Sequence, residues 1–273
     1  ADSGNINAQW MTGLLYRKGR GTDKDPARAF TWFAKAAQSG HAGAQGDMAE
    51  MLLNGEGVDR DDSQAAYWFA KATDGGDASA RMSLAGLYEQ GRGVDQDYRQ
   101  AADLYLESAV QGNTPALYKL GYFAQAGHAA EKSLSDARNW FQIAAERGHA
   151  ASQERVGYYR EMGLGGLEQD WFEAAQFYRR AALKGLPSAQ YRLGMLYHHG
   201  RGVMQNSDTA LRWISLSNRP TKLGGALPNA RNVYRQLVSG KSVQQKRELD
   251  AFVDGWRPHT ETTTASLGPW QAE

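Results

Sequence analysis

The sequence predicts an all-α solenoid, an array of stacked helix pairs, from three markers that recur in one register. A small residue recurs in steps of 36 residues with a single step of 37, at Ala8, Ala44, Ala80, Ala116, Ser152 and Ala189. A large apolar residue follows in the same steps, at Trp32, Trp68, Leu104, Trp140, Phe177 and Trp213. A glycine pair does so in five repeats, at Gly19/Gly21, Gly55/Gly57, Gly91/Gly93, Gly163/Gly165 and Gly200/Gly202.

The first half of each repeat has the pattern of a helix with one buried stripe. In residues 189–197 the shared apolar positions lie at i, i+4, i+7 and i+8, which is helical spacing. Glycine in a helix costs about 1 kcal/mol against alanine. Its recurrence at the sixth position therefore indicates a packing demand, at Gly13, Gly121, Gly157 and Gly194. The Gly-x-Gly turn then ends the helix, because glycine adopts the left-handed conformation readily.

The second half of each repeat has its own start and stop signals. Asp25 followed by Pro26 is typical of a helix N-terminus, with the carboxylate as the cap. The same capping role is expected at Asp61, Asp97, Ser133, Asp170 and Asn206. The helix stops at a glycine: Gly40, Gly76, Gly112, Gly148 or Gly185. We expect the large apolar marker, as at Trp68, to be buried between helix pairs.

The combined pattern A-x-x-x-L-G-x-x-Y-x-x-G-x-G-V-x-x-D-x-x-x-A-x-x-W-x-x-x-A-A-x-x-G resembles the Sel1-like repeat (SLR), a relative of the tetratricopeptide repeat. The resemblance covers about residues 5–218. It departs locally at Gly127-His128-Ala129-Ala130, which replaces Gly-x-Gly-Val, and at one extra residue around Gly165-Gly166. It implies a right-handed α/α superhelix of about six antiparallel helix pairs that serves as an adaptor for other proteins.

Taken in order, the chain divides into a lead, an array and a cap. Residues 1–6 are a polar lead. The repeats span 8–43, 44–79, 80–115, 116–151, 152–188 and 189–218. Residues 219–257 are a degenerate seventh unit followed by a capping helix, whose start at Ser242–Gln245 has the capping-box pattern. The tail, residues 258–273, is predicted to be disordered.

Composition excludes several classes of function. The net charge of +1 over 273 residues lacks the positive excess that is typical of nucleic-acid-binding proteins. The chain has no cysteine, which excludes disulfides and thiol nucleophiles. No run of 18 apolar residues is present, so we expect no transmembrane segment.

Neither glycine nor histidine patterns indicate a cofactor, a metal or catalysis. The Gly-x-Gly turn follows no strand and lacks the Lys-Ser/Thr of a phosphate loop. His198 and His199 would point about 100° apart on a helix, and no partner at ligand spacing is apparent. His41 and His149 hold equivalent turn positions, which indicates a structural role. We therefore expect a protein that is not an enzyme.

The candidate binding residues come from positions that the repeat leaves variable. By analogy with tetratricopeptide arrays, the third, seventh and tenth positions of each first helix face a concave groove. In repeats four to six this set of proposed partner-binding residues is Tyr118, Tyr122, Glu154, Tyr158, Glu161, Tyr191, Met195 and His198. Exposed aromatics and methionine are typical of binding hot spots. The alternative is that these side chains pack between adjacent first helices.

The expected function is a protein–protein interaction scaffold, monomeric or weakly self-associating. The resemblance suggests a bacterial periplasmic regulator of a signalling protein, or an assembly factor for envelope or exopolysaccharide machinery. The chain opens Ala-Asp-Ser-Gly without methionine, and bacterial relatives are often exported, so we expect a periplasmic or secreted protein, with the cytoplasm as the alternative. Two other functions stay open: a cell-wall or β-lactam-active enzyme, as among cysteine-rich relatives, and a self-associating structural protein.

Overall fold

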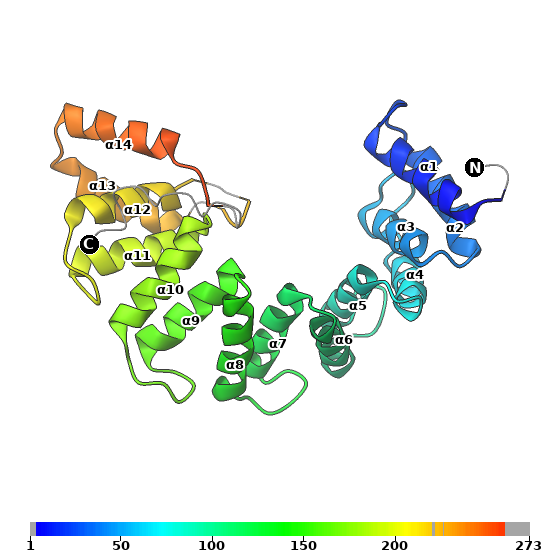
Figure 1. Cartoon of the computed structure of the whole chain (residues 1–273), viewed down its shortest axis with the longest axis horizontal. Coiled ribbons are helices and arrows are strands. Elements are labelled where there is room, and N and C mark those ends of the chain that lie inside the picture. Colours follow the sequence, from blue (N-terminus) through cyan, green and yellow to red (C-terminus); the bar gives the residue numbers. More distant parts are fainter. Residues whose placement is uncertain (1–3, 220–221, 226, 260–273) are drawn as a thin grey trace. The chain divides into compact units, whose positions relative to one another are not determined.

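The computed structural model describes residues 4–219, 222–225 and 227–259, and these form fourteen α-helices in hairpin-like succession (Figure 1). The first helices of the six repeats are α1 Ile6–Lys18, α3 Ala42–Asn54, α5 Ala78–Gln90, α7 Thr114–Ala126, α9 Ala150–Met162 and α11 Pro187–His199. The second helices are α2 Pro26–Gln38, α4 Asp62–Asp74, α6 Tyr98–Val110, α8 Leu134–Glu146, α10 Trp171–Leu183 and α12 Ser207–Ser217. The prediction of an all-α solenoid is confirmed.

The chain divides into two compact units, Ala1–Lys132 and Ser133–Glu273. The boundary falls between α7 and α8, the two helices of the fourth repeat. Within each unit, a second helix packs against the first helix of its own repeat and against the first helix of the next, as α2 does with α1 and α3. Each core is therefore a continuous layer between alternating first and second helices.

The predicted start and stop signals are confirmed in every repeat. The side chain before each second helix accepts a backbone N–H three residues on, as Asp25 does from Arg28 at 2.9 Å. The capping residues are Asp25, Asp61, Asp97, Ser133, Asp170 and Asn206. Each first helix ends at a left-handed glycine, from Gly19 at φ 64° to Gly200 at φ 67°.

Five of the six first helices also have side-chain caps, two of which are histidines, whereas α11 begins after Leu186 without one. The Nδ1 atom of His41 accepts the backbone N–H of Ala44 at 3.0 Å. The Nδ1 atom of His149 accepts that of Ser152 at 3.3 Å. Asparagine or aspartate does the same in other repeats, as at Asn113. The structural role expected for these two histidines is confirmed.

The sixth-position glycines make room for one residue of the second helix. A Cβ atom on Gly13 would lie 2.5 Å from the ring of Phe33, and one on Gly194 would lie 2.6 Å from Cγ1 of Ile214. Gly157 meets the ring of Tyr178 in the same way. These approaches are too short for any side chain, which confirms the packing demand inferred from the sequence.

The expectation that the large apolar marker is the buried residue is wrong for Trp68, which is only half-buried. The residue after the marker is buried in all six repeats, whereas among the markers only Leu104 and Trp213 are buried. The buried residues after the marker are Phe33, Phe69, Tyr105, Phe141, Tyr178 and Ile214. Adjacent helical residues point about 100° apart. The residue after the marker therefore points toward the small sixth-position residue, whereas Trp68 remains partly exposed.

The second glycine of each turn touches the second helix of the preceding repeat. A Cβ atom on Gly57 would lie 2.4 Å from the carbonyl carbon of Pro26, and one on Gly93 would lie 2.1 Å from the carbonyl oxygen of Asp62. Gly202 approaches the backbone of Trp171 as closely. A Cβ atom on Gly21, in the first repeat, would meet no neighbour within 4 Å among the described residues. The turn therefore acts as a contact between repeats, which exists only where a preceding repeat is present.

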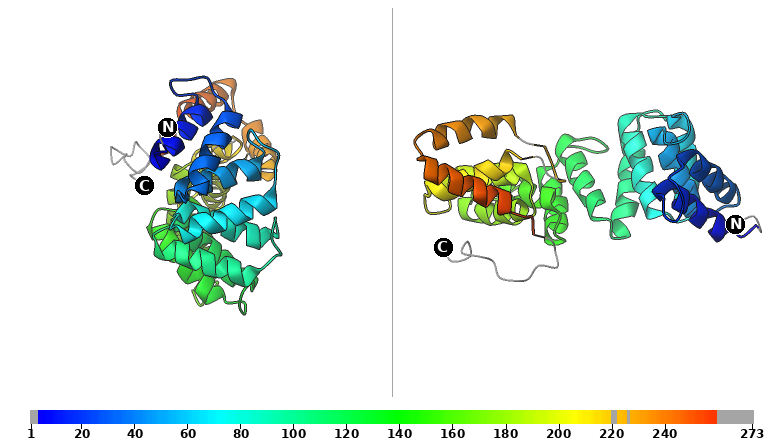
Figure 2. Two further views of the ribbon diagram at one scale, coloured as in Figure 1. Left: turned by 90° about the vertical axis from the view of Figure 1, so that its right-hand side faces the viewer. Right: turned by 90° about the horizontal axis from the view of Figure 1, so that it is seen from above.

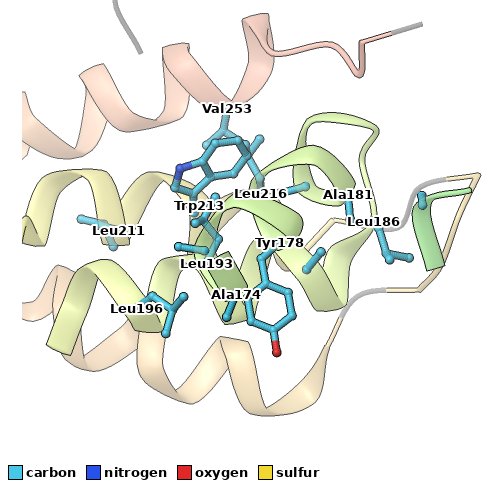
Figure 3. Close-up of a cluster of buried hydrophobic side chains, with 14 of the residues drawn as sticks. Ala174, Tyr178, Ala181, Leu186, Leu193, Leu196, Leu211, Trp213, Leu216 and Val253 are labelled. Atoms are coloured by element: carbon cyan, nitrogen blue, oxygen red, sulfur yellow. The ribbon is translucent and has the colours of Figure 1, made fainter. Parts of the chain in front are cut away.

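The C-terminal helices α13 (Pro228–Ser239) and α14 (Val243–Gly255) both pack on α12. In Figures 1 and 2, α14 lies along the yellow helices of the last repeat. Leu249 and Val253 of α14 join the buried cluster around Leu193 and Trp213 (Figure 3). The predicted capping box is present, with Ser242 and Gln245 exchanging hydrogen bonds at the start of α14. These helices shield the last repeat, as a terminal cap must.

The lead and the tail are largely outside the described residues. Helix α1 begins at Ile6, with Asn5 as its cap, inside the expected lead of residues 1–6. Residues 260–273, most of the tail predicted to be disordered, lie outside the described residues. In the part of the chain that the structure describes, no helix is long and apolar enough to cross a membrane.

Candidate functional site

The proposed binding residues fall into both compact units. Tyr118 and Tyr122 lie on α7 in the first unit, and their rings meet edge to face at a centroid distance of 5.2 Å. The rest belong to the second unit, on α9 and α11: Glu154, Tyr158, Glu161, Tyr191, Met195 and His198. All eight side chains are half-buried. Half-burial agrees with both roles considered for them, groove surface and packing between helices.

Arg192 on α11 gathers four side chains of the preceding repeat. Its guanidinium contacts Glu154 at 3.2 Å and Glu161 at 3.5 Å. The same group lies 5.0 Å from the ring centroid of Tyr158 and 5.7 Å from that of Tyr178. Three of the proposed binding residues, Glu154, Tyr158 and Glu161, are therefore tied to the next repeat through one cation.

Tyr178 on α10 adds a hydrogen bond to this arrangement. It is buried and donates its hydroxyl to the Glu161 carboxylate. Burial raises the pKa of the Tyr178 hydroxyl, the nearby Arg192 opposes this, and the bond to Glu161 raises it further. The phenol is therefore a permanent donor that holds Glu161 in place for Arg192.

A tyrosine, a glutamate and a cation form an equivalent triad in the first unit, at the positions of Tyr178, Glu161 and Arg192. Lys119 on α7 contacts Glu89 at 2.8 Å, and Tyr105 donates its hydroxyl to Glu89. Lys119 also lies 5.9 Å from the centroid of the Tyr105 ring. In both triads the carboxylate holds the tenth position of one repeat and the cation holds the fourth position of the next. The arrangement is thus a repeated device that joins neighbouring repeats.

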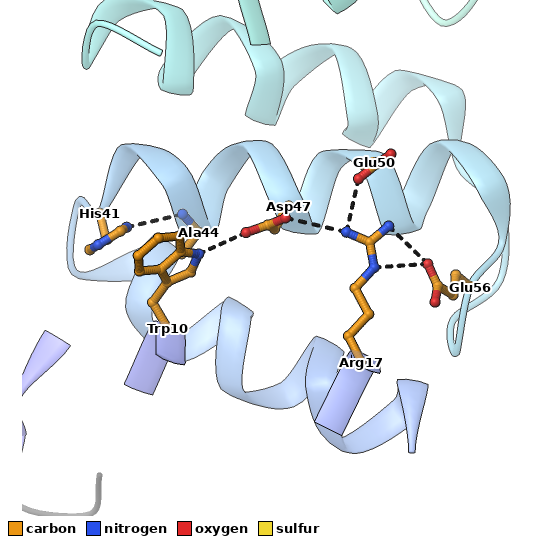
Figure 4. Close-up of polar contacts among 7 residues, drawn as sticks. All are labelled: Trp10, Arg17, His41, Ala44, Asp47, Glu50 and Glu56. Carbon is orange, nitrogen blue, oxygen red and sulfur yellow. Dashed lines mark hydrogen bonds and ion pairs between the residues drawn. The ribbon is translucent and has the colours of Figure 1, made fainter. Parts of the chain in front are cut away.

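The first two repeats use these two positions with the charges exchanged (Figure 4). Arg17 holds the tenth position of repeat one and contacts Asp47, at the fourth position of repeat two, at 3.2 Å. Glu50 and Glu56 also bind Arg17, at 2.8 and 2.9 Å. The indole Nε1 of Trp10 donates to Asp47 at 2.7 Å.

The Asp47 carboxyl is partly removed from water by this packing. Burial raises its pKa, whereas the Trp10 hydrogen bond and the charge of Arg17 lower it, and the net effect is a raised pKa. The third-position residue Trp10 thus takes part in the interface between repeats one and two through its hydrogen bond to Asp47. Among the third-position residues of the later first helices, Glu154 pairs with Arg192, whereas Tyr191 is not part of these ion pairs.

Sequence reasoning missed the fourth-position residues Lys119 and Arg192. A usable signal was present: residues of opposite charge recur 30 or 31 positions apart, at the tenth position of one repeat and the fourth of the next. The analogy with tetratricopeptide arrays directed attention to the third, seventh and tenth positions only. It therefore assigned Glu161 to a partner without considering an internal cation.

The remaining proposed residues share one side of α11. Tyr191, Met195 and His198 are spaced i, i+4 and i+7, and all three are half-buried. The ring of His198 lies 4.8 Å from that of His199. Among the described residues, no group of three or more His, Cys, Asp or Glu side chains could hold a metal ion. The chemistry on this side of α11 is that of apolar and aromatic contact.

Comparison with known proteins places these features in a family. The model of the Sel1 repeat matches six consecutive segments, residues 6–41, 42–77, 78–113, 114–149, 150–186 and 187–217. The chain belongs to the Sel1 repeat family. Each matched segment starts with a first helix, about two residues before the repeat boundaries expected from the sequence. Sel1 repeat proteins generally mediate protein–protein interactions, and their scaffold is typically not catalytic.

Solved and curated Sel1 relatives resemble the chain to different extents. A Sel1 repeat protein from Oxalobacter formigenes is 31% identical, with a TM-score of 0.73 over 79% of this chain and 88% of that one. A protective antigen of uropathogenic Escherichia coli with an SLR fold is 25% identical, over 93% of this chain and 68% of that one, with a TM-score of 0.46. The chitin synthase regulator SKT5 of Saccharomyces cerevisiae is 48% identical over 46 residues. That stretch is 17% of this chain and only 7% of the yeast protein.

Proposed function

We propose that this Sel1 repeat protein is a non-enzymatic adaptor that holds a segment of a partner protein against its first helices. The single observation that carries the proposal is the side of α11 formed by Tyr191, Met195 and His198. These residues are half-buried and lie outside the ion pairs that join the repeats. Aromatic and methionine side chains that remain accessible are the ones that binding surfaces use most.

The neighbouring triad supports this role by holding the surface rigid. Arg192 ties α11 to Glu154 and Glu161 on α9, so the two first helices keep one spacing. A surface whose side chains are already ordered loses less conformational entropy on binding. We infer that Glu154 and Glu161 position this surface, and that Tyr158 contributes its outer ring edge to the partner.

In the first unit, Tyr118 and Tyr122 on α7 form the second proposed contact. Solenoids of this kind offer extended surfaces rather than closed pockets. The partner segment is therefore expected to be long enough to engage several first helices, with aliphatic or aromatic anchors spaced along it. Weak self-association is compatible with the same surface.

The proposed setting is the bacterial cell envelope. The resemblance to exported Sel1 proteins supports a periplasmic regulator of a signalling protein or an assembly factor for envelope or exopolysaccharide machinery. The resemblance to a yeast regulator over a short stretch is in keeping with an adaptor role. Fractionation of cells that express the complete gene tests this setting, and recovery in the cytoplasm alone would contradict it.

Site-specific photo-crosslinking in the native host tests the adaptor role and its surface together. A photoreactive phenylalanine analogue at Tyr191 or Tyr122 is expected to capture one discrete partner. The matched control is the same analogue at Tyr67, an exposed tyrosine on the second helix α4. Equal capture of that partner from Tyr67 would show that the first helices are not the binding surface.

A further inference from the structure

A pair of side chains meets where the turn after a first helix contacts the second helix of the preceding repeat. One member is the residue that follows the first turn glycine, and the other is the first residue of that second helix. In the third repeat, Arg92 donates two hydrogen bonds to the Asp62 carboxylate, at 3.0 and 3.1 Å. In the fourth repeat, the ring of His128 stacks on that of Tyr98 at a centroid distance of 4.1 Å. The two positions are therefore in contact and hold matched side chains.

The sixth repeat keeps the arginine of this pair but lacks the carboxylate. Arg201 holds the position of Arg92, and Trp171 holds that of Asp62. The Arg201 guanidinium lies 4.9 Å from the centroid of the Trp171 ring. An aromatic ring attracts the cation but offers no oxygen atom to its N–H donors. Among the described residues no carboxylate pairs with Arg201, which is exposed, so its donors are accessible to one.

Two apolar side chains beside this pair are exposed where other repeats place small or polar residues. Met204 is 84% exposed and Phe172 is 62% exposed. Met204 lies two residues before the cap of α12, and that position is acidic in every earlier repeat, at Asp23, Asp59, Asp95, Glu131 and Glu168. Phe172 lies two residues after the cap of α10, where the equivalents are Ala27, Ser63, Arg99, Ser135 and Asp208. The two exposed apolar groups are thus specific to the junction of repeats five and six.

The backbone contact at this junction brings the four residues together. A Cβ atom on Gly202 would lie 2.2 Å from the carbonyl carbon of Trp171 and 2.5 Å from the amide nitrogen of Phe172. Arg201 directly precedes that glycine, and Met204 follows it by two residues. Trp171 also packs against the buried hydrophobic cluster of Figure 3, which fixes the ring that contacts Arg201.

We propose that Trp171, Phe172, Arg201 and Met204 form a docking surface, the junction surface, for an acidic peptide segment of a partner protein. A carboxylate of the partner binds the Arg201 guanidinium in the place that Asp62 takes at the third repeat. A large apolar side chain next to that carboxylate packs on Phe172 and Met204. None of the four residues belongs to the surface proposed on α11, and the inference does not depend on that surface.

The charges near the junction surface favour a peptide carboxylate over an anionic membrane. Glu168, Asp170 and Glu173 all lie within four residues of Phe172 along the chain. An anionic membrane attracts clusters of cations, and these carboxylates oppose that attraction. A single arginine, by contrast, has the planar set of N–H donors that matches one carboxylate.

Selection from a displayed library of random heptapeptides tests the proposal on the full chain. The library is first depleted on a triple variant, Phe172→Ser with Arg201→Gln and Met204→Asp, and then selected on the natural protein. We expect the retained peptides to carry aspartate or glutamate next to a large apolar residue. Arg201→Gln should weaken their binding about tenfold or more, because it removes the charged donor. Arg92→Gln is the matched control and should leave the affinity unchanged, because Asp62 already occupies that arginine.

Transfer of the junction surface to the third repeat provides a second test. Asp62→Trp, Ser63→Phe and Asp95→Met are made together in the triple variant, where Arg92 supplies the cation. This folded transplant should bind the selected peptides again. A folded transplant without affinity would overturn the assignment of binding to these four side chains.

Three other outcomes would also overturn the proposal. Equal affinity of the peptides for the natural protein and for Arg201→Gln would exclude the carboxylate site. Binding to phosphatidylglycerol vesicles that is lost in the triple variant, without any enriched peptide, would make the junction surface a membrane contact. Self-association that is lost in the triple variant would make a second copy of this chain the occupant. Crosslinking from Tyr191 does not depend on any of these results.

Discussion

Arg17 and Asp47 meet at 3.2 Å with the charges of the later repeats exchanged. In two later interfaces the tenth position carries the carboxylate and the fourth carries the cation, as Glu89 and Lys119 or Glu161 and Arg192 do. Either polarity therefore satisfies the geometry, provided that the two positions carry opposite charges. Like charges at these positions would be held close together in a half-buried site.

The first prediction is that exchanging the charges at positions 161 and 192 is better tolerated than changing one of them. Arg192→Glu should lose about 1–2 kcal/mol, between the values typical of exposed and buried pairs. Glu161→Arg together with Arg192→Glu should recover part of this loss, more so with Tyr178→Phe, because Phe33 stands there in the first repeat. Urea unfolding of Arg192→Glu, Glu161→Arg, the double variant and the triple variant measures the coupling. Lys241→Ala, which removes a pair with the exposed Asp208, is the control for a weak ion pair.

The second prediction separates backbone strain from close contact in the Gly-x-Gly turn. Gly21 and Gly93 have similar positive φ values, 74° and 71°, but only Gly93 lies against a neighbouring backbone. Gly21→Ala should cost about 1–2 kcal/mol, the price of a left-handed alanine. Gly93→Ala should cost about 1–3 kcal/mol more, because the second helix of repeat two must move. Equal losses in thermal melting would mean that conformation alone selects these glycines.

The third prediction concerns the pair Trp68 and Phe69. Phe69 is buried against its own first helix, so Phe69→Ala should cost about 3–5 kcal/mol. Trp68 is half-buried, and Trp68→Ala should cost clearly less, despite the larger side chain. Partial unfolding is common in solenoids, so circular dichroism and tryptophan fluorescence should be followed together. A larger loss for Trp68→Ala would restore the interpretation drawn from the sequence.

The fourth prediction is a dependence of stability on pH through the capping histidine His149. Burial first, and then the charge of Lys184, lower its pKa below the ordinary value of 6.5. The unfolded chain therefore binds the proton more readily than the folded one. The free energy of unfolding should fall as the pH drops below about 6.5, by at most about 1.4 kcal/mol per pH unit.

The control for this effect is His149→Asn, because Asn113 caps the equivalent helix of repeat four. This variant should keep the cap and lose the histidine's share of the pH dependence between pH 6.5 and 5. Identical pH profiles of the free energy of unfolding for the two proteins would rule out His149 as a contributor.

The fifth prediction sorts the candidate tyrosines by role. Tyr158 lies beneath Arg192, so Tyr158→Ala should lower stability as well as binding. Tyr191→Ala and Met195→Ala should leave the melting temperature nearly unchanged and weaken partner binding by about 1–2 kcal/mol each. Melting curves and the affinity for the crosslinked partner give both quantities. If Tyr191→Ala melts early and binds normally once folded, the side chain is packing between helices, and the surface on α11 is not the binding site.

The sequence predicted the fold because each repeat repeats its local signals. Caps such as Asp25 and left-handed glycines such as Gly19 act within a few residues of the chain, so their pattern can be interpreted directly. The sixth-position glycines were equally informative, because glycine destabilises a helix and its recurrence there indicates close packing. The choice between Trp68 and Phe69 was harder, because both are apolar and adjacent in sequence. Only the rotation of the helix about its own axis decides which of the two side chains faces the core.

The candidate site was less predictable, because it depends on contacts between repeats. Glu161 and Arg192 are 31 residues apart, and no local rule connects them. The charges of Arg17 and Asp47 are reversed, which hides the relationship from any search for one shared residue type. Only a comparison of the fourth and tenth positions across neighbouring repeats, with charge rather than identity as the criterion, reveals the pairing.

The reversed polarity of the first of these ion pairs also limits how the gene can gain or lose repeats. Loss of repeats two and three by unequal recombination would preserve the helical register yet place Arg17 opposite Lys119. Loss of repeats four and five would instead place Glu89 opposite Arg192, an acceptable match. Length variants whose new junctions join like charges are therefore expected to be less stable than those whose junctions join unlike charges, so that selection acts on repeat order as well as on repeat number.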